Sequence, residues 1–342
     1  MPMERDRYSR QILFRPIGRE GQSKLAQSRV AIVGMGALGT VSASHLVRAG
    51  VGYVRLIDRD VVEESNLQRQ SLYLEADALQ HRPKAEAAAQ ILREANSEVV
   101  IEPIVDDLHA TNAEWLLSDV DVIVDGTDNF QVRYLMNDIS VKHGIPWSYG
   151  GAVSSHGVTA FFRPEQTPCF VCLFGSDASM PGHDTCDTVG VISPVVSMIA
   201  SLQTADVLKY LTGNEARIAN RATHLDVWAN DYYHTELGQP REDCPCCKHH
   251  QYRALDAKSG AMAVSLCGRA TVQVRPDHPV AIDMEAFARR LAAFGKVNFN
   301  GHILRCELDG ATLTLFQDGR ALVHGTSEPA VARMLYARYV GM

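Results

Sequence analysis

The sequence lacks an apolar run long enough to cross a membrane. Its longest apolar stretch, "VGVISPVVSMIASL", is broken at Ser193-Pro194, and it falls short of the about 20 residues that a spanning helix needs. The first residues, "MPMERDRYSRQ", are charged from the fourth position onward, so they contain no apolar signal-peptide core. These absences predict a soluble protein of the cytoplasm with no membrane partner.

The chain also lacks an excess of positive charge, internal repeats and low-complexity segments. Its 33 Lys and Arg residues are outnumbered by 40 Asp and Glu residues, which gives a net charge of −7. Nonspecific binding to nucleic acid is therefore not favoured. With 342 residues, of which 46% are hydrophobic, the chain can hold one large domain and a small one.

Short apolar runs alternate with segments of helical spacing over roughly the first 150 residues. The predicted strands are Val30–Val33, Tyr53–Ile57, Val99–Val105 and Val120–Val124, followed by one in "IPWSYGGAV". The predicted helices end at Gly50, begin near Pro83, and cover Asn129–His143. Alternating strands and helices form a parallel sheet with both faces covered. The predicted fold class is therefore α/β, with a Rossmann-like, doubly wound sheet.

The pattern changes further along the chain. The segment from Val158 to Asp226 is less regular, although it contains a long apolar helix from about Pro194 to Leu211. We assign residues 1–250 to the Rossmann-like domain. Residues 251–342 contain strand-like runs such as "HILRCEL" and "TLTLF" together with two helix-like segments. They predict a small α+β domain with the element order β-α-β-β-β-α and no assigned role.

A glycine-rich turn, "GMGALG", joins the first predicted strand to a helix. Gly34, Gly36 and Gly39 fit the spacing G-x-G-x-x-G, which allows a tight turn, the approach of a phosphate and close helix–strand packing. The helix start offers unpaired N–H groups and a positive dipole end to an anion. Asp58, at the end of the next strand, is placed to bind ribose hydroxyl groups. A nucleotide is favoured over a tight turn without a ligand, but the turn does not identify which nucleotide.

Polar and charged residues follow at the expected carboxyl edge of the sheet. They are Asn66, Arg69, Lys84, Asp128 and Asn129. Two cations and a carboxylate around a phosphate site suit a triphosphate with Mg²⁺, whereas a dehydrogenase needs neither. Each residue alone has an ordinary explanation: Lys84 and Arg69 as solvated side chains, and Asp128 as a helix cap. Their joint spacing favours a nucleoside triphosphate.

Two C-x-x-C pairs lie roughly 75 residues apart. Cys169 and Cys172 form the first pair, and Cys244 and Cys247 form the second. Four thiolates can hold a tetrahedral structural zinc ion, which would tie the end of the domain to its middle and contribute to folding. The alternatives are four unrelated buried thiols, or a C-x-C arrangement that includes Cys246. We favour Cys244 with Cys247.

Six motifs, in order along the chain, resemble one family. They are "RYSRQI", "GMGALG", "LIDRDVVEESNLQRQ", "RPKAE", "DGTDN" and "GVISPVVSMIASLQTADVLKYLTG". From about Arg7 to Cys247 the chain is similar to the ThiF/MoeB family, which comprises bacterial relatives of ubiquitin-activating enzymes. The resemblance implies an ATP-dependent adenylyltransferase that activates the C-terminal glycine of a ubiquitin-like sulfur carrier, of the ThiS or MoaD type. Such carriers serve thiamine or molybdopterin biosynthesis, and their terminal residues are Gly-Gly.

The resemblance also assigns roles to individual residues. Asp58 would hold ribose, Asn66, Arg69 and Lys84 would contact the phosphates, Asp128 would bind Mg²⁺, and the paired cysteines would bind Zn²⁺. Arg10 matches an arginine that the family supplies to the phosphates across a homodimer interface. Cys186, in "GHDTCDTVGVISP", matches a cysteine that attacks the acyl adenylate or joins the carrier through sulfur in some members, and is dispensable in others.

Other functions stay open on sequence grounds. An NAD-dependent oxidoreductase would explain the glycine turn but not Arg10, Arg69, Lys84, Asp128 or the paired cysteines. A carrier-binding scaffold without catalysis would need a defect that the sequence does not display. A branch of the family that cyclises a modified tRNA base is disfavoured by the acidic charge balance.

The source of sulfur is not encoded in a recognisable motif. Some members of the family carry a C-terminal rhodanese domain that delivers persulfide sulfur. Residues 251–342 are shorter than that domain, and "SLCGRATV" lacks the loop around cysteine that would cradle a persulfide. We therefore expect a separate donor, such as a cysteine desulfurase.

Overall fold

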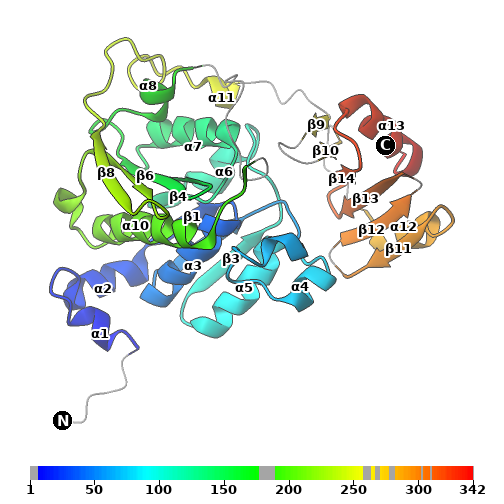
Figure 1. Cartoon of the computed structure of the whole chain (residues 1–342), viewed down its shortest axis with the longest axis horizontal. Helices are drawn as coiled ribbons and strands as arrows, with labels where there is room; N and C mark the ends of the chain where they lie inside the picture. Colours follow the sequence, from blue (N-terminus) through cyan, green and yellow to red (C-terminus); the bar gives the residue numbers. More distant parts are fainter. Residues whose placement is uncertain are drawn as a thin grey trace. The chain divides into compact units, whose positions relative to one another are not determined.

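The computed structural model describes most of the chain as two compact units (Figure 1). The described residues are 7–176, 189–256, 263–265, 270–276, 282–301, 303–308 and 310–341. The first unit comprises residues 1–78 and 84–258, and the second comprises residues 79–83 and 259–342. Within the described residues, no helix combines the length and the apolar character that a bilayer span requires.

An eight-stranded sheet forms the centre of the first unit, with the order β3-β2-β1-β4-β5-β6-β7-β8. Pairs from β3 to β5 are parallel, and pairs from β5 to β8 are antiparallel. The strands are β1 (Arg29–Val33), β2 (Tyr53–Ile57), β3 (Val100–Ile104), β4 (Val122–Asp125), β5 (Trp147–Val153), β6 (His156–Phe162), β7 (Arg221–Asp226) and β8 (Asp231–Glu236). All four strands expected before residue 126 are present.

Helices cover both faces of the parallel part of this sheet. One face carries α3 (Ala37–Ala49), α5 (Lys84–Ala95) and α10 (Ser193–Leu211), and the other carries α6 (Ala113–Leu117), α7 (Phe130–His143) and α8 (Phe170–Phe174). Ile32 of β1 packs into the first of these cores, and its neighbour Val33 packs into the second. Burial on both faces explains why the four residues from Val30 to Val33 are all apolar. The Rossmann-like, doubly wound fold expected from the sequence is confirmed.

Shorter helical segments complete this part of the chain. They are α1 (Ser9–Ile12), α2 (Gly18–Gln27), η1 (Glu64–Asn66), α4 (Glu75–Leu79), η2 (Glu215–Arg217) and α11 (Arg253–Asp256). The long helix α10 begins one residue before the expected Pro194, which occupies its first turn. Proline is well suited to that position because the first N–H groups of a helix have no partner within it.

The direction of sheet growth reverses between β1 and β4. Strands β2 and β3 are added on one side of β1, whereas β4 is added on the other side. In open parallel sheets, ligands bind outside the carboxyl ends of the strands at such a switch point. The segments that follow Val33, Ile57 and Asp125, the last residues of β1, β2 and β4, are therefore the place to look for a site.

The region after Val158 is more regular than its sequence indicates. It continues the sheet, because β6 pairs with β5 and β7, and β7 pairs with β8. All six residues of the edge strand β8 are exposed. A strand that is exposed on both faces has no alternation of apolar and polar residues, which explains why the pattern did not predict it.

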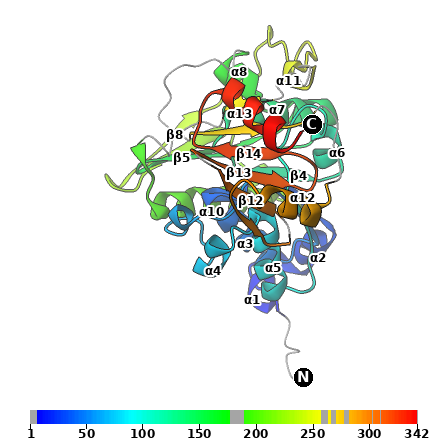
Figure 2. The same cartoon turned by 90° about the vertical axis from the view of Figure 1, so that its right-hand side faces the viewer.

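The second unit is a six-stranded antiparallel sheet with two helices packed on one face (Figures 1 and 2). The strand order is β11-β12-β13-β14-β10-β9. The strands are β9 (Ala263–Ser265), β10 (Thr271–Val274), β11 (Lys296–Phe299), β12 (Ile303–Leu308), β13 (Ala311–Phe316) and β14 (Ala321–His324). The helices are α12 (Met284–Leu291) and α13 (Pro329–Tyr339).

The element order expected for this unit is wrong in two places. The described order is β-β-α-β-β-β-β-α, because β9 and β10 form a hairpin and β11 precedes β12. Strand β11 contains only four residues, none of which is fully buried. A short edge strand of this kind gives too weak a pattern for prediction from sequence.

Candidate functional site

The turn after β1 contains two glycines that the packing of the protein itself requires. Gly34 has a φ of +90°, and a Cβ there would lie 2.8 Å from the carbonyl group of Gly126. A Cβ on Gly39 would lie 1.9 Å from the carbonyl oxygen of Gly34. Real Cβ atoms do not approach backbone atoms this closely. A side chain at either position would push the start of α3 away from β1.

Gly36 differs from its two neighbours. A Cβ there would meet only the Gly126 carbonyl oxygen at 3.8 Å and the Gln70 amide nitrogen at 3.9 Å, which are ordinary van der Waals distances. The N–H groups of Gly36, Ala37 and Leu38 have no backbone partner among the described residues, as expected around the first turn of a helix. Glycine at this position leaves these donors open to an anion.

Asp58 follows β2 and joins two loops. Its Oδ2 accepts a hydrogen bond of 2.6 Å from the Met35 N–H in the glycine turn, and its Oδ1 accepts one of 2.7 Å from the Asp60 N–H. Burial raises the pKa of Asp58, and the nearby Lys84 ammonium and the two N–H donors oppose this rise. Each carboxylate oxygen can accept a second hydrogen bond. Asp58 can therefore hold the turn and still accept from ribose hydroxyl groups.

Lys84 begins α5 and is buried beside a second carboxylate. It is only 3% exposed, and its Nζ lies 3.4 Å from Asp60 Oδ2. Its backbone N–H also donates to the Asp60 carbonyl oxygen at 2.9 Å. A buried ammonium needs a partner of opposite charge, so the structure excludes the explanation of Lys84 as a solvated helix residue. Its positive charge is held close to the glycine turn through Asp60 and Asp58.

The short helix η1 buries Asn66 and leaves Arg69 half-buried. Asn66 Oδ1 accepts from the Glu63 N–H at 3.0 Å, whereas Asn66 Nδ2 is buried without a hydrogen-bond partner in the described part of the chain. A buried donor without a partner is unfavourable, and an oxygen of a bound nucleotide would satisfy it. Arg69 Nη1 donates to the Ser65 carbonyl oxygen at 2.9 Å, which leaves further guanidinium donors for an anion. These residues fit a nucleotide.

The segment after β4 gives Asp128 and Asn129 different surroundings. Asn129 is the N-cap of α7, and its Oδ1 accepts from the Gln131 N–H at 2.9 Å. Asp128 is exposed next to it. Because Asn129 supplies the cap, the helix-capping explanation of Asp128 no longer applies. Asn129, by contrast, caps α7. The sequence analysis assigned it only to nucleotide binding.

Two buried residues that the sequence analysis did not select support this segment. The Arg133 Nε donates to Asp125 Oδ2 at 2.8 Å, and its Nη2 donates to the carbonyl oxygens of Thr127 and Gly150. Gln203 Nε2 donates to the Asp125 carbonyl oxygen at 2.9 Å. Together they fix the end of β4 and the start of the loop that carries Asp128. Neither residue stands out in the sequence, because α7 and α10 each contain several other polar residues.

Arg10 lies at the opposite end of α3 from the glycine turn. It is exposed on α1, and the adjacent Gln11 donates to the Ala49 carbonyl oxygen, at the C-terminal end of α3, at 2.9 Å. Helix α3 has 13 residues, and a helix of that length spans about 20 Å. The structure therefore does not bring Arg10 to the turn of its own chain. Cys186, the last of the predicted catalytic residues, lies outside the described residues.

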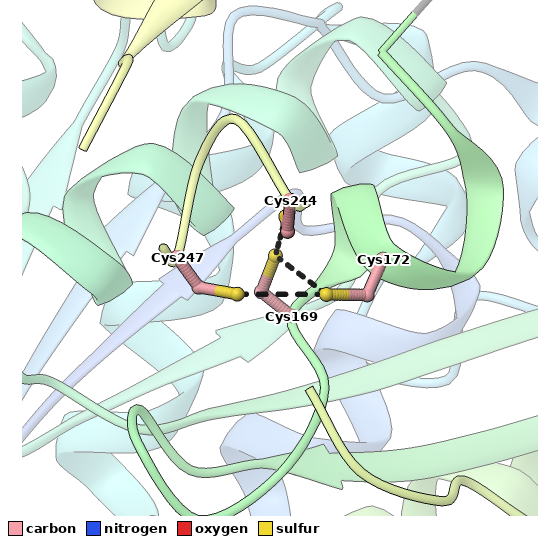
Figure 3. A group of neighbouring side chains, drawn as sticks. All are labelled: Cys169, Cys172, Cys244 and Cys247. Atoms are coloured by element: carbon pink, nitrogen blue, oxygen red, sulfur yellow. Dashed lines mark hydrogen bonds between the residues drawn. The ribbon is translucent and has the colours of Figure 1, made fainter. Parts of the chain in front are cut away.

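The four cysteines predicted to bind zinc lie together (Figure 3). Sulfur–sulfur distances are 3.8 Å between Cys169 and Cys172, 3.6 Å between Cys169 and Cys244, and 3.5 Å between Cys172 and Cys247. All four sulfur atoms lie within 4.8 Å of one another. Tetrahedral bonds of about 2.3 Å to a zinc ion would separate the sulfur atoms by about 3.8 Å. The cluster could hold a metal ion.

Cys246 is not one of the four clustered cysteines, although its side chain lies near Cys169. Its Sγ accepts a hydrogen bond of 3.2 Å from Asn137 Nδ2 and donates one of 3.4 Å to Asp138 Oδ1, both on α7. As thiols, Cys172 and Cys247 hold their protons firmly. The neighbouring Cys169 thiol and burial raise the pKa of Cys172 to about 12, and burial and adjacent thiols raise the pKa of Cys247 to about 12. Metal binding would release these protons.

Comparison with known proteins identifies the family to which the chain belongs. A model of the ThiF family matches residues 8–246. The chain belongs to the ThiF family. The match ends beside the second cysteine pair, so it takes in every described residue of the candidate nucleotide site.

Relatives of this ThiF family member include activating enzymes. The sulfur carrier protein ThiS adenylyltransferase of Bacillus subtilis (strain 168) is 45% identical over 337 residues, which cover 98% of this chain and 99% of that protein. The SAMP-activating enzyme E1 of Haloferax volcanii is 36% identical over 243 residues, which cover 71% of this chain and 88% of that protein. The Bacillus match extends through the second unit. This ThiF family member is therefore an adenylyltransferase and not an oxidoreductase.

Solved structures show the same fold. E. coli MccB, in a crystal structure with ATP, aligns with a TM-score of 0.61 and 24% sequence identity, over 71% of this chain and 75% of that chain. The aligned share agrees in length with the first unit, which holds the sheet and its glycine turn. Over the aligned share, this ThiF family member thus has the same fold as MccB.

Replacing Gly36 with alanine should leave the protein folded, because a Cβ there meets no protein atom closer than 3.8 Å. It should weaken ATP binding, because this Cβ would lie where a phosphate approaches the N–H groups at the start of α3. Gly39→Ala should instead lower the free energy of unfolding by about 2 kcal/mol, because overpacking forces backbone shifts. Titration calorimetry with ATP and thermal unfolding separate the two effects. A Gly36→Ala variant that binds ATP as tightly as the native protein would contradict the assigned cradle.

Proposed function

We propose that this chain uses ATP to adenylate the C-terminal glycine carboxylate of a ubiquitin-like sulfur carrier of the ThiS type, with release of pyrophosphate. The nucleotide site carries the proposal. The N–H groups at the start of α3 and the Asn66 amide lack partners among the described residues, and together with the buried Lys84 ammonium they suit phosphate oxygens. Similarity to a ThiS adenylyltransferase over nearly the whole chain supports the choice of carrier. We assign the reaction to thiamine biosynthesis, with molybdopterin biosynthesis as the alternative.

The proposed reaction is an attack of the carrier's terminal carboxylate on the α-phosphorus of ATP. A bond forms between a carboxylate oxygen and this phosphorus, the bond from the phosphorus to the bridging oxygen breaks, and pyrophosphate leaves. No general base is needed because the carboxylate is ionised at neutral pH. The main task of the site is to hold two anionic reactants in line. The product is an acyl adenylate that a sulfur nucleophile can attack.

Each site residue has a defined task in this proposal. Asp58 binds the ribose hydroxyl groups while it continues to hold the Met35 N–H. Asn66, Arg69 and Lys84 bind phosphate oxygens and balance their negative charge. Asp128 binds Mg²⁺, which would supply further positive charge at the phosphates when bound.

The reaction is tested by exchange of labelled pyrophosphate into ATP in the presence of a carrier that ends in Gly-Gly. Exchange should require the carrier, and a carrier without its last glycine should support none. Asp128→Ala and Asp128→Asn should each reduce exchange by about a hundredfold or more, because a neutral side chain binds Mg²⁺ much more weakly than a carboxylate does and metal contacts are worth several kcal/mol.

The asparagine variant distinguishes the possible tasks of Asp128. It keeps the size of the side chain and a hydrogen-bond acceptor, and the helix cap on Asn129 is untouched. Near-normal exchange by Asp128→Asn would remove the metal role. A native protein that shows no carrier-dependent exchange would refute the proposed function itself.

We further propose that the cysteine cluster holds a structural Zn²⁺. Metal analysis should find about one zinc ion per chain, and chelation should lower the thermal stability. Cys244→Ser should lose the zinc ion, whereas Cys246→Ser is the matched control and should keep it, because Cys246 Sγ contacts Asn137 and Asp138 instead. Full zinc content in the Cys244→Ser variant would overturn the assignment of the ligands.

We propose that the active form is a cytoplasmic homodimer in which Arg10 serves the phosphate site of the other protomer. The distance of Arg10 from its own turn, about the length of α3, supports an action across an interface. Arg10→Ala and Lys84→Ala should each abolish exchange. Mixing the two inactive variants as dimers should restore roughly a quarter of the native exchange, because half of the sites in half of the dimers are complete.

The control for the mixing experiment is a double variant, Arg10→Ala with Lys84→Ala, mixed with either single variant. Neither mixture contains a complete site, so neither should recover activity. Failure of the two single variants to restore activity when they form mixed dimers would show that Arg10 does not act across the interface.

The later steps of sulfur transfer are proposed from the sequence. We propose that Cys186 acts after adenylation, as the thiol that meets the acyl adenylate or the carrier. The sulfur itself would come from a separate donor protein, such as a cysteine desulfurase. The attack of a sulfur atom on the acyl adenylate releases AMP, so this step follows the release of pyrophosphate and does not affect the exchange reaction.

A further inference from the structure

Tyr73 is a buried side chain that the proposed mechanism does not use. It is 5% exposed and packs in the same core as Met35, beneath the glycine turn. Its hydroxyl donates to the Met35 carbonyl oxygen at 2.6 Å and lies 3.3 Å from the Lys84 carbonyl oxygen. One side chain therefore contacts both the turn after β1 and the start of α5.

These contacts close a ring of hydrogen bonds beside the phosphate site. The N–H groups of Met35 and Asp60 donate to the two oxygens of Asp58. The Lys84 N–H donates to the Asp60 carbonyl oxygen, and the Tyr73 hydroxyl lies between Lys84 and Met35. Within the ring, Asp58 fixes the N–H of Met35 and Tyr73 fixes its carbonyl group.

Fixing the Met35 carbonyl group also fixes the next N–H group along the chain. The peptide bond between Met35 and Gly36 is trans, and the C=O and N–H of a trans peptide point in opposite directions. Because the Met35 C=O points to the buried Tyr73 hydroxyl, the Gly36 N–H points to the other side of the turn. This N–H is one of the donors at the start of α3 that have no backbone partner in the described structure.

We propose that Tyr73 is a positioning residue for adenylation, whose hydroxyl orients the Gly36 N–H and the start of α5, with Lys84, for the phosphates. The inference rests on the proposed function for the identity of the nucleotide. Phenylalanine at this position would keep the packing of the ring but lose the hydroxyl contacts with the Met35 and Lys84 carbonyl oxygens. The turn would then sample orientations in which the Gly36 N–H does not face a phosphate, so nucleotide binding should suffer more than the chemical step.

Tyr73→Phe tests this inference, with Tyr336→Phe as the matched control. Tyr336, in the second unit, is 2% exposed, and its hydroxyl also donates to a backbone carbonyl oxygen, that of Gly319, at 2.6 Å. Each variant loses one buried hydroxyl donor, which contacts two carbonyl oxygens in the case of Tyr73 and one in the case of Tyr336. Their thermal stability should therefore fall by similar amounts. In carrier-dependent pyrophosphate exchange, Tyr73→Phe should raise KM for ATP about tenfold, with kcat and KM for the carrier changed less than about twofold.

Direct binding gives an independent measure. The affinity for α,β-methylene ATP, measured by titration calorimetry, should fall by the same factor in Tyr73→Phe and stay at the native value in Tyr336→Phe. Native affinity in Tyr73→Phe, or equal losses in the two variants, would overturn the positioning role. A native protein that binds the analogue but shows no exchange would refute the proposed function alone, because the binding experiment would still measure the effect of Tyr73.

Discussion

One carboxylate holds together the two loops from which the nucleotide site is built. Asp58 accepts hydrogen bonds from the turn after β1, through Met35, and from the loop after β2, through Asp60. Asp60 in turn holds both the backbone N–H and the ammonium of Lys84. The residue that we assign to ribose is therefore also the joint between the phosphate cradle and its buried cation. Any change at Asp58 would disturb all three parts of the site together.

The three glycines of the turn carry two different kinds of information. Gly34 and Gly39 are required by contacts within the protein, since their Cβ atoms would overlap backbone atoms. They identify the fold and say nothing about the ligand. The protein without a ligand has room for a side chain at Gly36. The need for glycine at this position must therefore come from the ligand that binds there. This is why a G-x-G-x-x-G motif predicts a nucleotide without naming it, and why the charged residues Lys84 and Asp128 had to distinguish a triphosphate from a dinucleotide.

The sequence predicts the parts of the structure whose signal lies within a short stretch of chain. Strands β1, β2 and β4 are largely buried and mostly apolar and were predicted, whereas the exposed edge strand β8 has no such pattern. Contacts between distant segments were not predictable. The contacts of the buried Arg133 and of the Tyr73 hydroxyl depend on which loops meet in space. The surroundings of Cys246 were also not predictable. The spacing left this cysteine as an alternative metal ligand, whereas in the fold its sulfur contacts α7.

The charge of the site supports the proposal that positive charge from outside a single chain takes part in the chemistry. The carboxylates of Asp58, Asp60 and Asp128 stand against three cations, Lys84, Arg69 and Arg59, the last of which lies 3.8 Å from Asp60. These protein groups therefore have no net positive charge when all are ionised. A triphosphate and a carrier carboxylate add several more negative charges, and like charges repel strongly where water is excluded. Binding both reactants therefore requires positive charge from elsewhere. Mg²⁺ at Asp128 and the partner's Arg10 are the two sources in this proposal, and the remote position of Arg10 in its own chain accords with the second.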